Sequence, residues 1–566
     1  MRTPLFLASI LILHPLATPL LAQGSCDEPV LGTNLARVLH YQTQIPFVDV
    51  FTSARTWFSQ QVPHGAWDTG EPIATDANGW VTSLAPGQAV ATIMLTEQGG
   101  NYPAGQYICL YDGEGTLEFR QNASIVSQQP GRIVVQIDPT TTGLSWMRIT
   151  QTNPANYLRN IRLIMPGFEA TYETQVFHPS FLESLEPYGV IRFMDWQNTN
   201  HSDLVDWDDR TKVTNYTMAT DSGVALEHMV ALCNRVGASP WFCIPHLATD
   251  DFITQFATYV RDNLDPSLHV YIEHSNEVWN SVFQQHSYVK QAGLARGLST
   301  DSWDAGLRYH AAHSVEIFQI WEGVWGGTDR LVRVIAGWSA TPGVNITLMD
   351  WDDAYLNADA LATAPYFGGG LGLTVPQTEA MSIDELLDVV QAKLEDPTQL
   401  AATMASNTNQ AMARGLRHIT YEGGQGLVNF GQPDNDTLTS LYVNANRSPR
   451  MGDLYDTYLS AWRANSNADL FVHYLLIRYS SESGSWGSME SQMQDPSTAY
   501  KWQALQDYSS THCSSPADID GDGVVGVNDL LSLLSVWDAC VSCPEDLDGN
   551  GQVDVFDLLQ LLADWS

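Results

Sequence analysis

Two glutamates in this sequence each follow an apolar run of the kind that forms a buried strand. Glu277 ends the run that begins at Val270, and Glu422 ends the run that begins at His418. One carboxyl of such a pair can protonate a leaving oxygen while the other attacks or stabilises an anomeric carbon, which is the chemistry of glycosidic bond cleavage. A single glutamate in such a position is more often a surface or salt-bridge residue, so the hypothesis depends on the pair.

Elements that alternate along the chain could bring these two glutamates together. From about residue 186, apolar strand-like runs alternate with helix-like stretches. The strand candidates are residues 30–35, 189–196, 239–246, 270–277, 331–338, 360–366, 418–422 and 470–477. The helix candidates include residues 47–60, 224–236, 254–264, 383–394 and 453–465.

Eight strand–helix units predict an α/β fold, a (β/α)8 TIM barrel, with a doubly wound open sheet as the alternative. Active sites of such barrels form at the carboxyl ends of the strands. Glu277 and Glu422 end the fourth and seventh strand candidates, so they would face each other across the barrel mouth.

Residues 67–170 interrupt this alternation. They are rich in Gly, Thr and turn residues, contain short alternating runs, and predict a small inserted β-sandwich. The first barrel unit would then occupy residues 23–66 and the remainder of the barrel residues 171–510. The insertion could bind sugar, or it could be a scaffold that shapes the cleft.

With its two strand-end glutamates, the predicted barrel resembles clan A glycoside hydrolases. In that clan, an Asn-Glu pair at the fourth strand supplies the acid/base, and a glutamate at the seventh supplies the nucleophile. The resemblance implies that Glu277 is the acid/base, Glu422 the nucleophile, and Asn276 the donor to the sugar 2-hydroxyl. It also implies double displacement, with retention of anomeric configuration and no cofactor for catalysis.

Four more strand-end residues match positions of the clan. By resemblance, Arg192 lies near the nucleophile, Tyr366 hydrogen-bonds it, Trp486 forms the platform under the sugar, and His246 is a site histidine. Glu422 must stay ionised, which Arg192 and Tyr366 would favour. The alternatives are a barrel ion pair for Arg192, packing for Tyr366 and a structural role for His246. Glu273 and Glu482 are the nearest competing carboxylates.

The C-terminal residues 516–566 contain eleven acidic residues and neither Lys nor Arg. Two segments place oxygen donors at loop positions 1, 3, 5 and 12 and glycine at position 6, which is a calcium-loop pattern. The predicted ligands are Asp518, Asp520, Asp522 and Asp529 in the first loop, and Asp546, Asp548, Asn550 and Asp557 in the second.

These loops differ from complete EF-hands. The twelfth ligand is Asp instead of Glu, and no long helix precedes either loop, although an apolar helix-like run follows each. In these features the segment resembles a type I dockerin. That resemblance implies a small all-α domain, two Ca²⁺ ions and docking to a cohesin-like or cell-surface partner. A purely structural calcium module is the alternative.

The N-terminus indicates export. Arg2 precedes an apolar run that ends near Ala22, which predicts a signal peptide over residues 1–22. His14, Pro15 and Pro19 interrupt the run and disfavour a membrane anchor, so we expect a secreted or cell-surface protein. Among the seven cysteines, Cys233 and Cys243 could form a bridge, and Cys513, Cys540 and Cys543 could staple the C-terminal unit.

The composition excludes some classes of partner. The formal net charge of −38 argues against a nucleic-acid binder and disfavours anionic membrane surfaces and acidic substrates. The sequence thus predicts a secreted retaining β-glycosidase acting on a neutral polysaccharide such as cellulose, xylan or mannan. The alternatives are a non-catalytic carbohydrate-binding protein on a degenerate barrel, or a calcium-dependent adhesion protein.

Overall fold

The computed structural model describes most of the chain in two units. The described residues are 30–62, 65–96, 99, 101–140, 143–429, 434–467, 469–512, 517–519, 525–540 and 543–565. A large unit extends to Ser510, and a small unit begins at Thr511. The predicted signal peptide, Cys26, Cys513, Asp520 and Asp522 lie outside the described residues.

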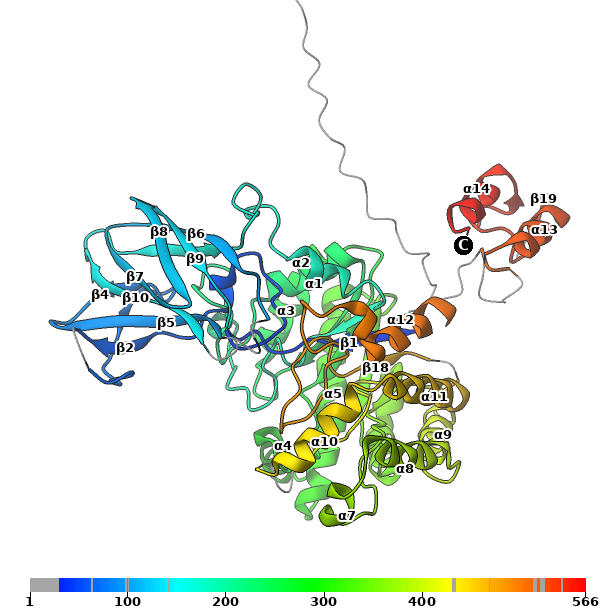
Figure 1. Ribbon diagram of the computed structural model, residues 1–566. Coiled ribbons are helices and arrows are strands. Elements are labelled where there is room, and N and C mark those ends of the chain that lie inside the picture. Colours follow the sequence, from blue (N-terminus) through cyan, green and yellow to red (C-terminus); the bar gives the residue numbers. More distant parts are fainter. Residues whose placement is uncertain are drawn as a thin grey trace, which may run out of the picture. The chain divides into compact units, whose positions relative to one another are not determined.

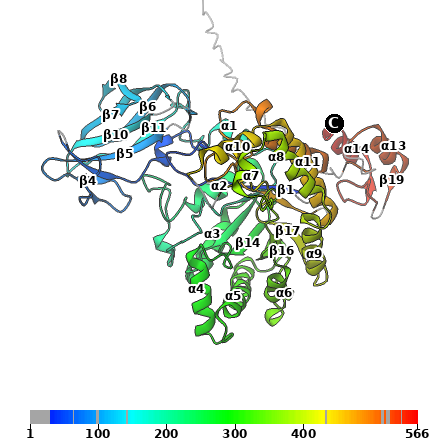
Figure 2. The same ribbon diagram turned by 60° about the horizontal axis from the view of Figure 1, so that its bottom comes forward.

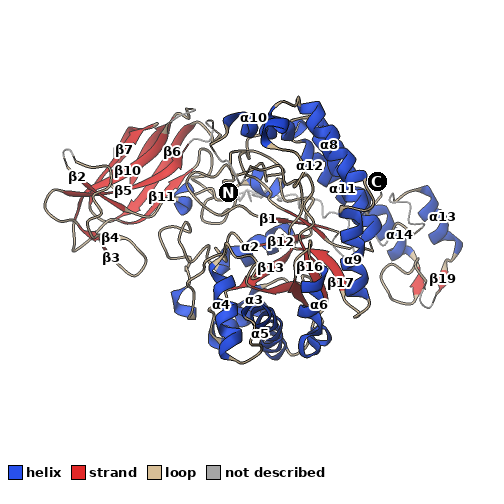
Figure 3. Ribbon diagram, turned by 90° about the horizontal axis from the view of Figure 1, so that it is seen from below, coloured by secondary structure: helices blue, strands red, loops and turns tan. Residues whose placement is uncertain are grey.

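Eight parallel strands form the centre of the large unit (Figure 3). In chain order they are β1 (Leu31–Asn34), β12 (Val190–Arg192), β13 (Ser239–Ile244), β14 (Val270–His274), β15 (Leu331–Ala336), β16 (Ala360–Thr363), β17 (Arg417–Thr420) and β18 (Phe471–His473). Each pairs with the next along the chain up to β17, and β18 returns to pair with β1. The Thr420 amide donates to the Leu470 carbonyl at 3.1 Å, so the barrel is nearly closed. This sequential order confirms the TIM barrel and excludes the open doubly wound sheet.

Helices surround these strands (Figures 1 and 2). Those of the large unit are α1 (Pro179–Glu183), α2 (Leu226–Val236), α3 (Asp250–Asn263), α4 (Gln284–Ala295), α5 (Ser302–Trp325), α6 (Pro342–Asp350), α7 (Val375–Glu379), α8 (Ile383–Glu395), α9 (Leu400–Met412), α10 (Asp436–Asn446), α11 (Pro449–Asn465) and α12 (Tyr500–His512). Helix α3 shows why they form. Thr249 caps the Phe252 amide, and apolar residues at helical spacing are buried, including Phe252, Phe256 and Val260.

Two four-stranded antiparallel sheets occupy the stretch where an inserted β-sandwich is expected. One sheet has the order β2 (Phe58–Gln61), β5 (Gln88–Thr96), β10 (Leu144–Thr152) and β7 (Gly115–Gln121). The other has the order β11 (Arg159–Ile164), β6 (Gly105–Asp112), β9 (Arg132–Ile137) and β8 (Ala123–Gln129), and a small pair joins β3 (Ala74–Thr75) to β4 (Val81–Ser83). Residues of both large sheets, such as Met147 and Val135, share one hydrophobic core.

The helix expected at residues 47–60 is wrong. A 3-10 turn at Val50–Ser53 and strand β2 occupy that stretch. Phe47 forms a β-bridge to Phe177, and Phe58 pairs with Ala91 of β5. Pairing with distant strands therefore overrides the local apolar spacing, and the antiparallel sheets begin at Phe58, before the expected boundary at residue 67.

The small unit contains two helices and a short strand pair in its described residues. Helix α13 (Val527–Ser535) and helix α14 (Val555–Ala563) match the two predicted apolar runs. Strands β19 (Asp538–Ala539) and β20 (Gln552–Val553) are antiparallel, so the unit is not all-α as expected. Leu533 and Leu561 are fully buried in its core. Cys540 and Cys543 form a disulfide, as anticipated for a small unit.

Two further findings concern the cysteines and the membrane. Cys233 and Cys243 are buried free thiols, so the suggested bridge between them is wrong. Among the described residues, no helix combines the length and the apolar character needed to cross a membrane.

Candidate active site

Arg192, the last residue of β12, is the hub of a buried polar network at the barrel mouth. Its guanidinium donates to Glu273 twice, from Nε at 2.9 Å and from Nη2 at 3.0 Å. Nη1 donates to Glu422 Oε1 at 3.0 Å and to Asn34 Oδ1 at 3.1 Å. Nη2 also donates to Asn276 Oδ1 at 2.9 Å. Arg192 is 0% exposed. Its guanidinium connects residues at or just beyond the carboxyl ends of four barrel strands, which are β1, β12, β14 and β17.

Glu422 lies beyond the end of β17 and accepts from two of the predicted site residues. Besides Arg192, the Tyr366 hydroxyl donates to its second oxygen at 2.9 Å. Tyr366 itself lies just beyond β16. The structure therefore brings Arg192, Tyr366 and Glu422 together as a carboxylate with two donors.

Glu277 lies three residues beyond the end of β14. The Tyr421 hydroxyl donates to its Oε1 at 2.9 Å, and Asn280 Nδ2 donates to its Oε2 at 2.9 Å. Its backbone is left-handed, with a φ of 40°, and so is that of Ser275, with a φ of 58°. Such conformations are rare outside glycine and cluster at functional sites, where surrounding contacts hold them in place.

Asn276 is 2% exposed, and both ends of its amide are bonded to protein groups. Its oxygen accepts from Arg192, and its nitrogen donates to Asn200 Oδ1 at 3.0 Å. Gln285 donates to the same Asn200 oxygen at 2.7 Å and to the Asn276 carbonyl at 2.8 Å. This network fixes the orientation of the Asn276 amide beside Arg192.

A cavity of about 480 Å³ adjoins Glu277. Its lining includes Tyr366, Tyr421, Lys393 and Trp338, and Trp338 has 40% of its surface exposed. An exposed indole beside hydroxyl and amide groups suits the apolar face and the hydroxyls of a sugar. Trp196, by contrast, is fully buried in the core.

The remaining two predicted residues have different surroundings. The Trp486 ring lies perpendicular to that of Tyr366 at 5.6 Å and 5.9 Å from that of Tyr474, so it belongs to the Glu422 side of the site. His246 is 1% exposed and packs edge-on against Tyr288. Burial lowers its pKa to about 4. Among the described residues, neither ring nitrogen of His246 has a hydrogen-bond partner, so no hydrogen bond joins it to either carboxylate.

The electrostatics of Glu422 differ from the expectation that it is held ionised. Burial raises the pKa of its carboxyl to about 8, and the Glu277 charge adds to the rise. Arg192 and the Tyr366 hydrogen bond oppose it without cancelling it. Because Arg192 is shared with Glu273, its charge compensates only part of the negative charge at the mouth. The pair of carboxyls therefore retains one proton near neutral pH.

This proton predicts the alkaline limb of the pH profile. Only the first step of a double displacement, which kcat/KM reports, needs a proton on the pair, so kcat/KM is expected to fall with an apparent pKa near 8. Tyr366→Phe removes a donor that lowers the Glu422 pKa, so its limb should move to higher pH. If the alkaline limbs of kcat/KM have the same apparent pKa in the wild type and in Tyr366→Phe, the limb does not report the Glu422 carboxyl.

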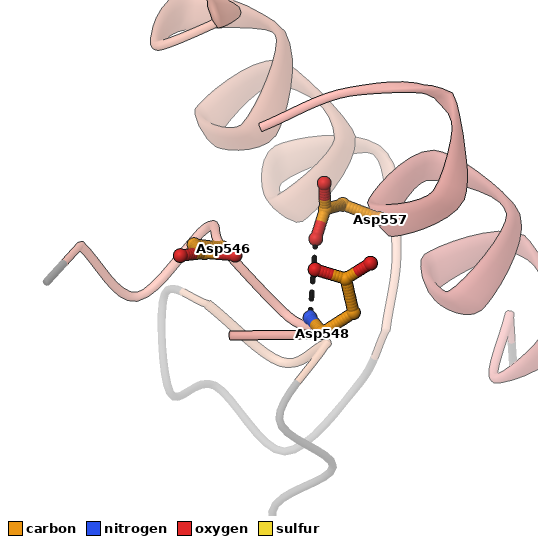
Figure 4. A group of neighbouring side chains, drawn as sticks. All are labelled: Asp546, Asp548 and Asp557. Carbon is orange, nitrogen blue, oxygen red and sulfur yellow. Dashed lines mark hydrogen bonds between the residues drawn. The ribbon is translucent and has the colours of Figure 1, made fainter. Parts of the chain in front are cut away.

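In the small unit, three carboxylates of the second predicted loop converge (Figure 4). Oxygens of Asp546, Asp548 and Asp557 lie within 4.8 Å of one another. Asp557 also accepts from the Leu547 amide at 2.7 Å, which fixes the loop around it. Three hard oxygen donors at this spacing fit Ca²⁺. In the first loop, Asp518 and Asp529 are described and are both buried.

Calcium is therefore expected to stabilise the small unit. In calorimetry of the full-length protein, its melting transition should rise with Ca²⁺ and fall with EDTA, since a ligand at 100 times its Kd contributes about 2.7 kcal/mol. Asp548→Asn should weaken this response, whereas the neighbouring Glu545→Gln should keep it. A transition indifferent to EDTA would show that the loops do not bind the metal.

Several functional candidates were not identified from the sequence. Tyr421 and Asn280 hold Glu277, while Asn34 and Glu273 hold Arg192. Glu273 appeared only as a competing carboxylate. The sequence does contain a signal for Glu273, which is the arginine inside the apolar strand run at Arg192. A buried guanidinium needs a carboxylate partner, and a neighbouring strand is where that partner is expected.

Comparisons with known proteins give remote structural likeness only. No protein-family model and no curated protein matches the chain. Among solved structures, the GH51 arabinofuranosidase from Xanthomonas axonopodis pv. citri is 12% identical, with 54% of this chain and 61% of that chain covered and a TM-score of 0.34. The alignment thus spans less than two thirds of that enzyme.

Two further structures belong to other families. XEG5A, a GH5 xyloglucan-specific endo-β-1,4-glucanase from a metagenomic library, is 10% identical, with 58% of this chain and 86% of that chain covered and a TM-score of 0.32. Xylanase 10C from Cellvibrio japonicus is also 10% identical, with 80% and 97% covered and a TM-score of 0.32. These neighbours are clan A glycoside hydrolases. At such similarity, the barrel assignment depends on the strand order itself.

Proposed function

We propose that this protein is a retaining glycoside hydrolase that cleaves a neutral polysaccharide by double displacement. The observation that carries the proposal is the pair of carboxylates beyond the ends of β14 and β17. Glu277 is held by Tyr421 beside the cavity, and Glu422 is held by Arg192 and Tyr366. Two opposed carboxyls with separate donors are what this reaction requires.

In the first step, a Glu422 oxygen attacks the anomeric carbon while Glu277 gives its proton to the departing glycosidic oxygen. Arg192 and Tyr366 then stabilise the negative charge on Glu422 whenever the carboxylate is free. In the second step, Glu277 takes a proton from water, which attacks the same carbon and releases Glu422. Asn276, which is held by Arg192 and Asn200, would contact the hydroxyl next to the reacting carbon.

A neutral glycan such as cellulose, xylan or mannan is the substrate class that fits best. Trp338 offers an exposed aromatic face in the cavity, and Thr398, Gln399 and Thr403 offer neutral polar groups. Trp486 would form the platform on the Glu422 side. The net charge of −38 disfavours polyanions in general.

The two antiparallel sheets would be an inserted β-sandwich that supports the barrel mouth. Thr217, in the segment after β12, donates to the Ala54 carbonyl at 2.6 Å, and the Trp57 amide donates to the Tyr216 hydroxyl at 2.9 Å. These bonds join the sheets to a segment of the barrel, which favours the scaffold role.

We also propose that the small unit is a calcium-binding, dockerin-like module of a secreted protein. Apolar side chains remain on the surfaces of both its helices: Val527, Leu531 and Leu534 on α13, and Val555, Phe556, Leu559 and Leu562 on α14. Exposed apolar residues at helical spacing favour docking to a protein partner, cohesin-like or on the cell surface.

The direct test is a hydrolysis panel with purified full-length protein in calcium. Wild type is expected to release reducing sugar from at least one of cellulose, xylan, mannan and related glucans, while Glu277→Gln releases none. Binding to one of these glycans without release would instead favour the non-catalytic carbohydrate-binding alternative.

A further inference from the structure

Lys501 is a buried lysine in a chain that contains only four lysines. It lies in the first turn of α12 and is 5% exposed. Its Nζ donates to the Ser485 carbonyl at 2.6 Å and to Asn446 Oδ1 at 3.2 Å. Burying an ammonium group is unfavourable unless the group is hydrogen-bonded or paired. The two acceptors of Lys501 therefore indicate which segments this lysine holds together.

The Ser485 carbonyl connects Lys501 to the segment that carries Glu422. Gln425, three residues after Glu422, donates from Nε2 to the same carbonyl at 2.8 Å. Gln425 Oε1 accepts from the Leu427 amide at 2.9 Å and from Asn446 Nδ2 at 3.3 Å. Lys501, Asn446, Gln425 and Ser485 therefore form a buried network in which Lys501 carries the charge.

Trp486 follows Ser485 directly. Its indole lies perpendicular to the Tyr366 ring at 5.6 Å, and Tyr366 donates to Glu422. Its carbonyl accepts from the Leu475 amide at 2.8 Å, beyond the end of β18. The Ser485 carbonyl, which belongs to the peptide bond that leads into Trp486, is thus held by both Lys501 and Gln425, while the indole N–H donates to the Ser483 carbonyl at 2.7 Å.

We propose that Lys501 is a positioning residue that clamps the Trp486 segment to the Glu422 segment, so that the protonation of one buried amine sets the placement of the Trp486 indole. The consequence for substrate binding rests on the proposed function, in which Trp486 is the platform under the sugar. The placement of the indole itself is a property of the fold.

The surroundings of Lys501 make this clamp sensitive to pH. Burial lowers the pKa of Lys501 to about 7, and the Glu490 charge opposes the shift. Glu490 is itself paired with Arg447 at 2.8 Å. Burial lowers the pKa of His473 of β18 to about 3, and the Lys501 charge adds to this shift, so His473 stays neutral across this range. Its ring bonds to Tyr455 of α11 at 3.0 Å. Loss of the proton above pH 7 replaces an ionic donor by a weaker neutral one.

The test is fluorine NMR of the full-length protein labelled with 5-fluorotryptophan. The Trp486 resonance is assigned by its disappearance in Trp486→Phe and then followed from acidic to alkaline pH. In the wild type, its shift should change with a midpoint near pH 7. In Lys501→Met that transition should vanish, whereas Lys212→Met, at an exposed lysine paired with Asp208, should titrate like the wild type.

A second variant keeps the test decisive if Lys501→Met does not fold. Asn446→Asp places a carboxylate beside the amine, so the Trp486 midpoint should move to higher pH. A Trp486 resonance that shows no transition near pH 7 in the wild type, or the same transition in Lys501→Met, would overturn the proposal. So would an unmoved midpoint in Asn446→Asp.

Activity provides a separate readout. On any glycan that the wild type cleaves, Lys501→Met should lower kcat/KM roughly tenfold, because hydrogen bonds to a charged group are lost. A wild type that cleaves none would count against the proposed function while leaving the fluorine result to decide the clamp.

Discussion

Replacing Glu422 by alanine is expected to lower kcat by roughly 10³–10⁶-fold, the range seen when a nucleophile is removed. Glu422 would form the bond to the anomeric carbon, and neither Glu273 nor Glu277 is free to substitute for it. Glu273 is fully buried and bonded to Arg192, and Glu277 is bonded to Tyr421. The barrel should stay folded, because Arg192 keeps its two bonds to Glu273.

Azide supplies the control for the role of Glu422. In Glu422→Ala, a small anion can occupy the space of the carboxylate and attack the anomeric carbon, so azide should restore turnover on an activated substrate and release a glycosyl azide. Glu183→Gln, at an exposed glutamate of α1, should keep wild-type activity. A Glu422→Ala variant that retains kcat within about tenfold of the wild type would contradict a nucleophilic role.

Replacing Arg192 by methionine is expected to cost about 3–5 kcal/mol of unfolding free energy, as when one partner of a buried ion pair is removed. Both Arg192 and Glu273 are 0% exposed, so the variant leaves an unpaired carboxylate inside the barrel. In the described part of the chain, Glu273 would keep only Trp241 Nε1 at 2.8 Å and Cys243 Sγ at 3.3 Å as donors. Chemical denaturation monitored by fluorescence measures the change.

Two further variants separate charge burial from loss of packing. Arg132→Met removes a bidentate partner of Glu169 at the surface, and exposed pairs of that kind contribute about 0.2–1 kcal/mol. Adding Glu273→Gln to Arg192→Met removes the orphaned charge, so the double variant should be more stable than the single one. If Arg192→Met costs less than about 1 kcal/mol, Arg192 is not the buried hub described above.

The barrel and its two glutamates could be predicted because their signals are local. The strand candidates at residues 270–277 and 418–422 are short apolar runs, and β14 and β17 lie within or beside them. The carboxyl ends of parallel strands meet at one rim, so a polar residue after each run marks the site. Once the strands are assigned in order, the topology brings Arg192, Tyr366 and Glu422 together without further information.

The contacts of Glu277 could not be predicted in the same way. Successive residues of a strand point to opposite faces, so alternation places only one of Tyr421 and Glu422 in the site. Strand β17 ends at Thr420, after which the backbone turns and both side chains reach the mouth. The wrong helix at residues 47–60 has a related cause, since its strand partners lie far away in sequence.

The charge state of Glu422 is the other departure from expectation. From the sequence, Arg192 is expected to be a cation available to Glu422, but in the structure Glu273 accepts two of its hydrogen bonds. Burial then outweighs the remaining stabilisation and raises the Glu422 pKa to about 8. The number of Arg192 hydrogen bonds that each carboxylate receives depends on side-chain geometry. The spacing of strands along the sequence does not reveal that geometry.

The proposed function depends on a covalent bond between Glu422 and the sugar. It is tested by treating the full-length protein with a panel of 2-deoxy-2-fluoroglycosides carrying a good leaving group, followed by proteolysis and mass spectrometry. We expect one added fluorosugar on the peptide that contains Glu422, and no label in Glu422→Ala. A label on another carboxylate, or rapid turnover of these reagents with inversion and no label, would contradict it.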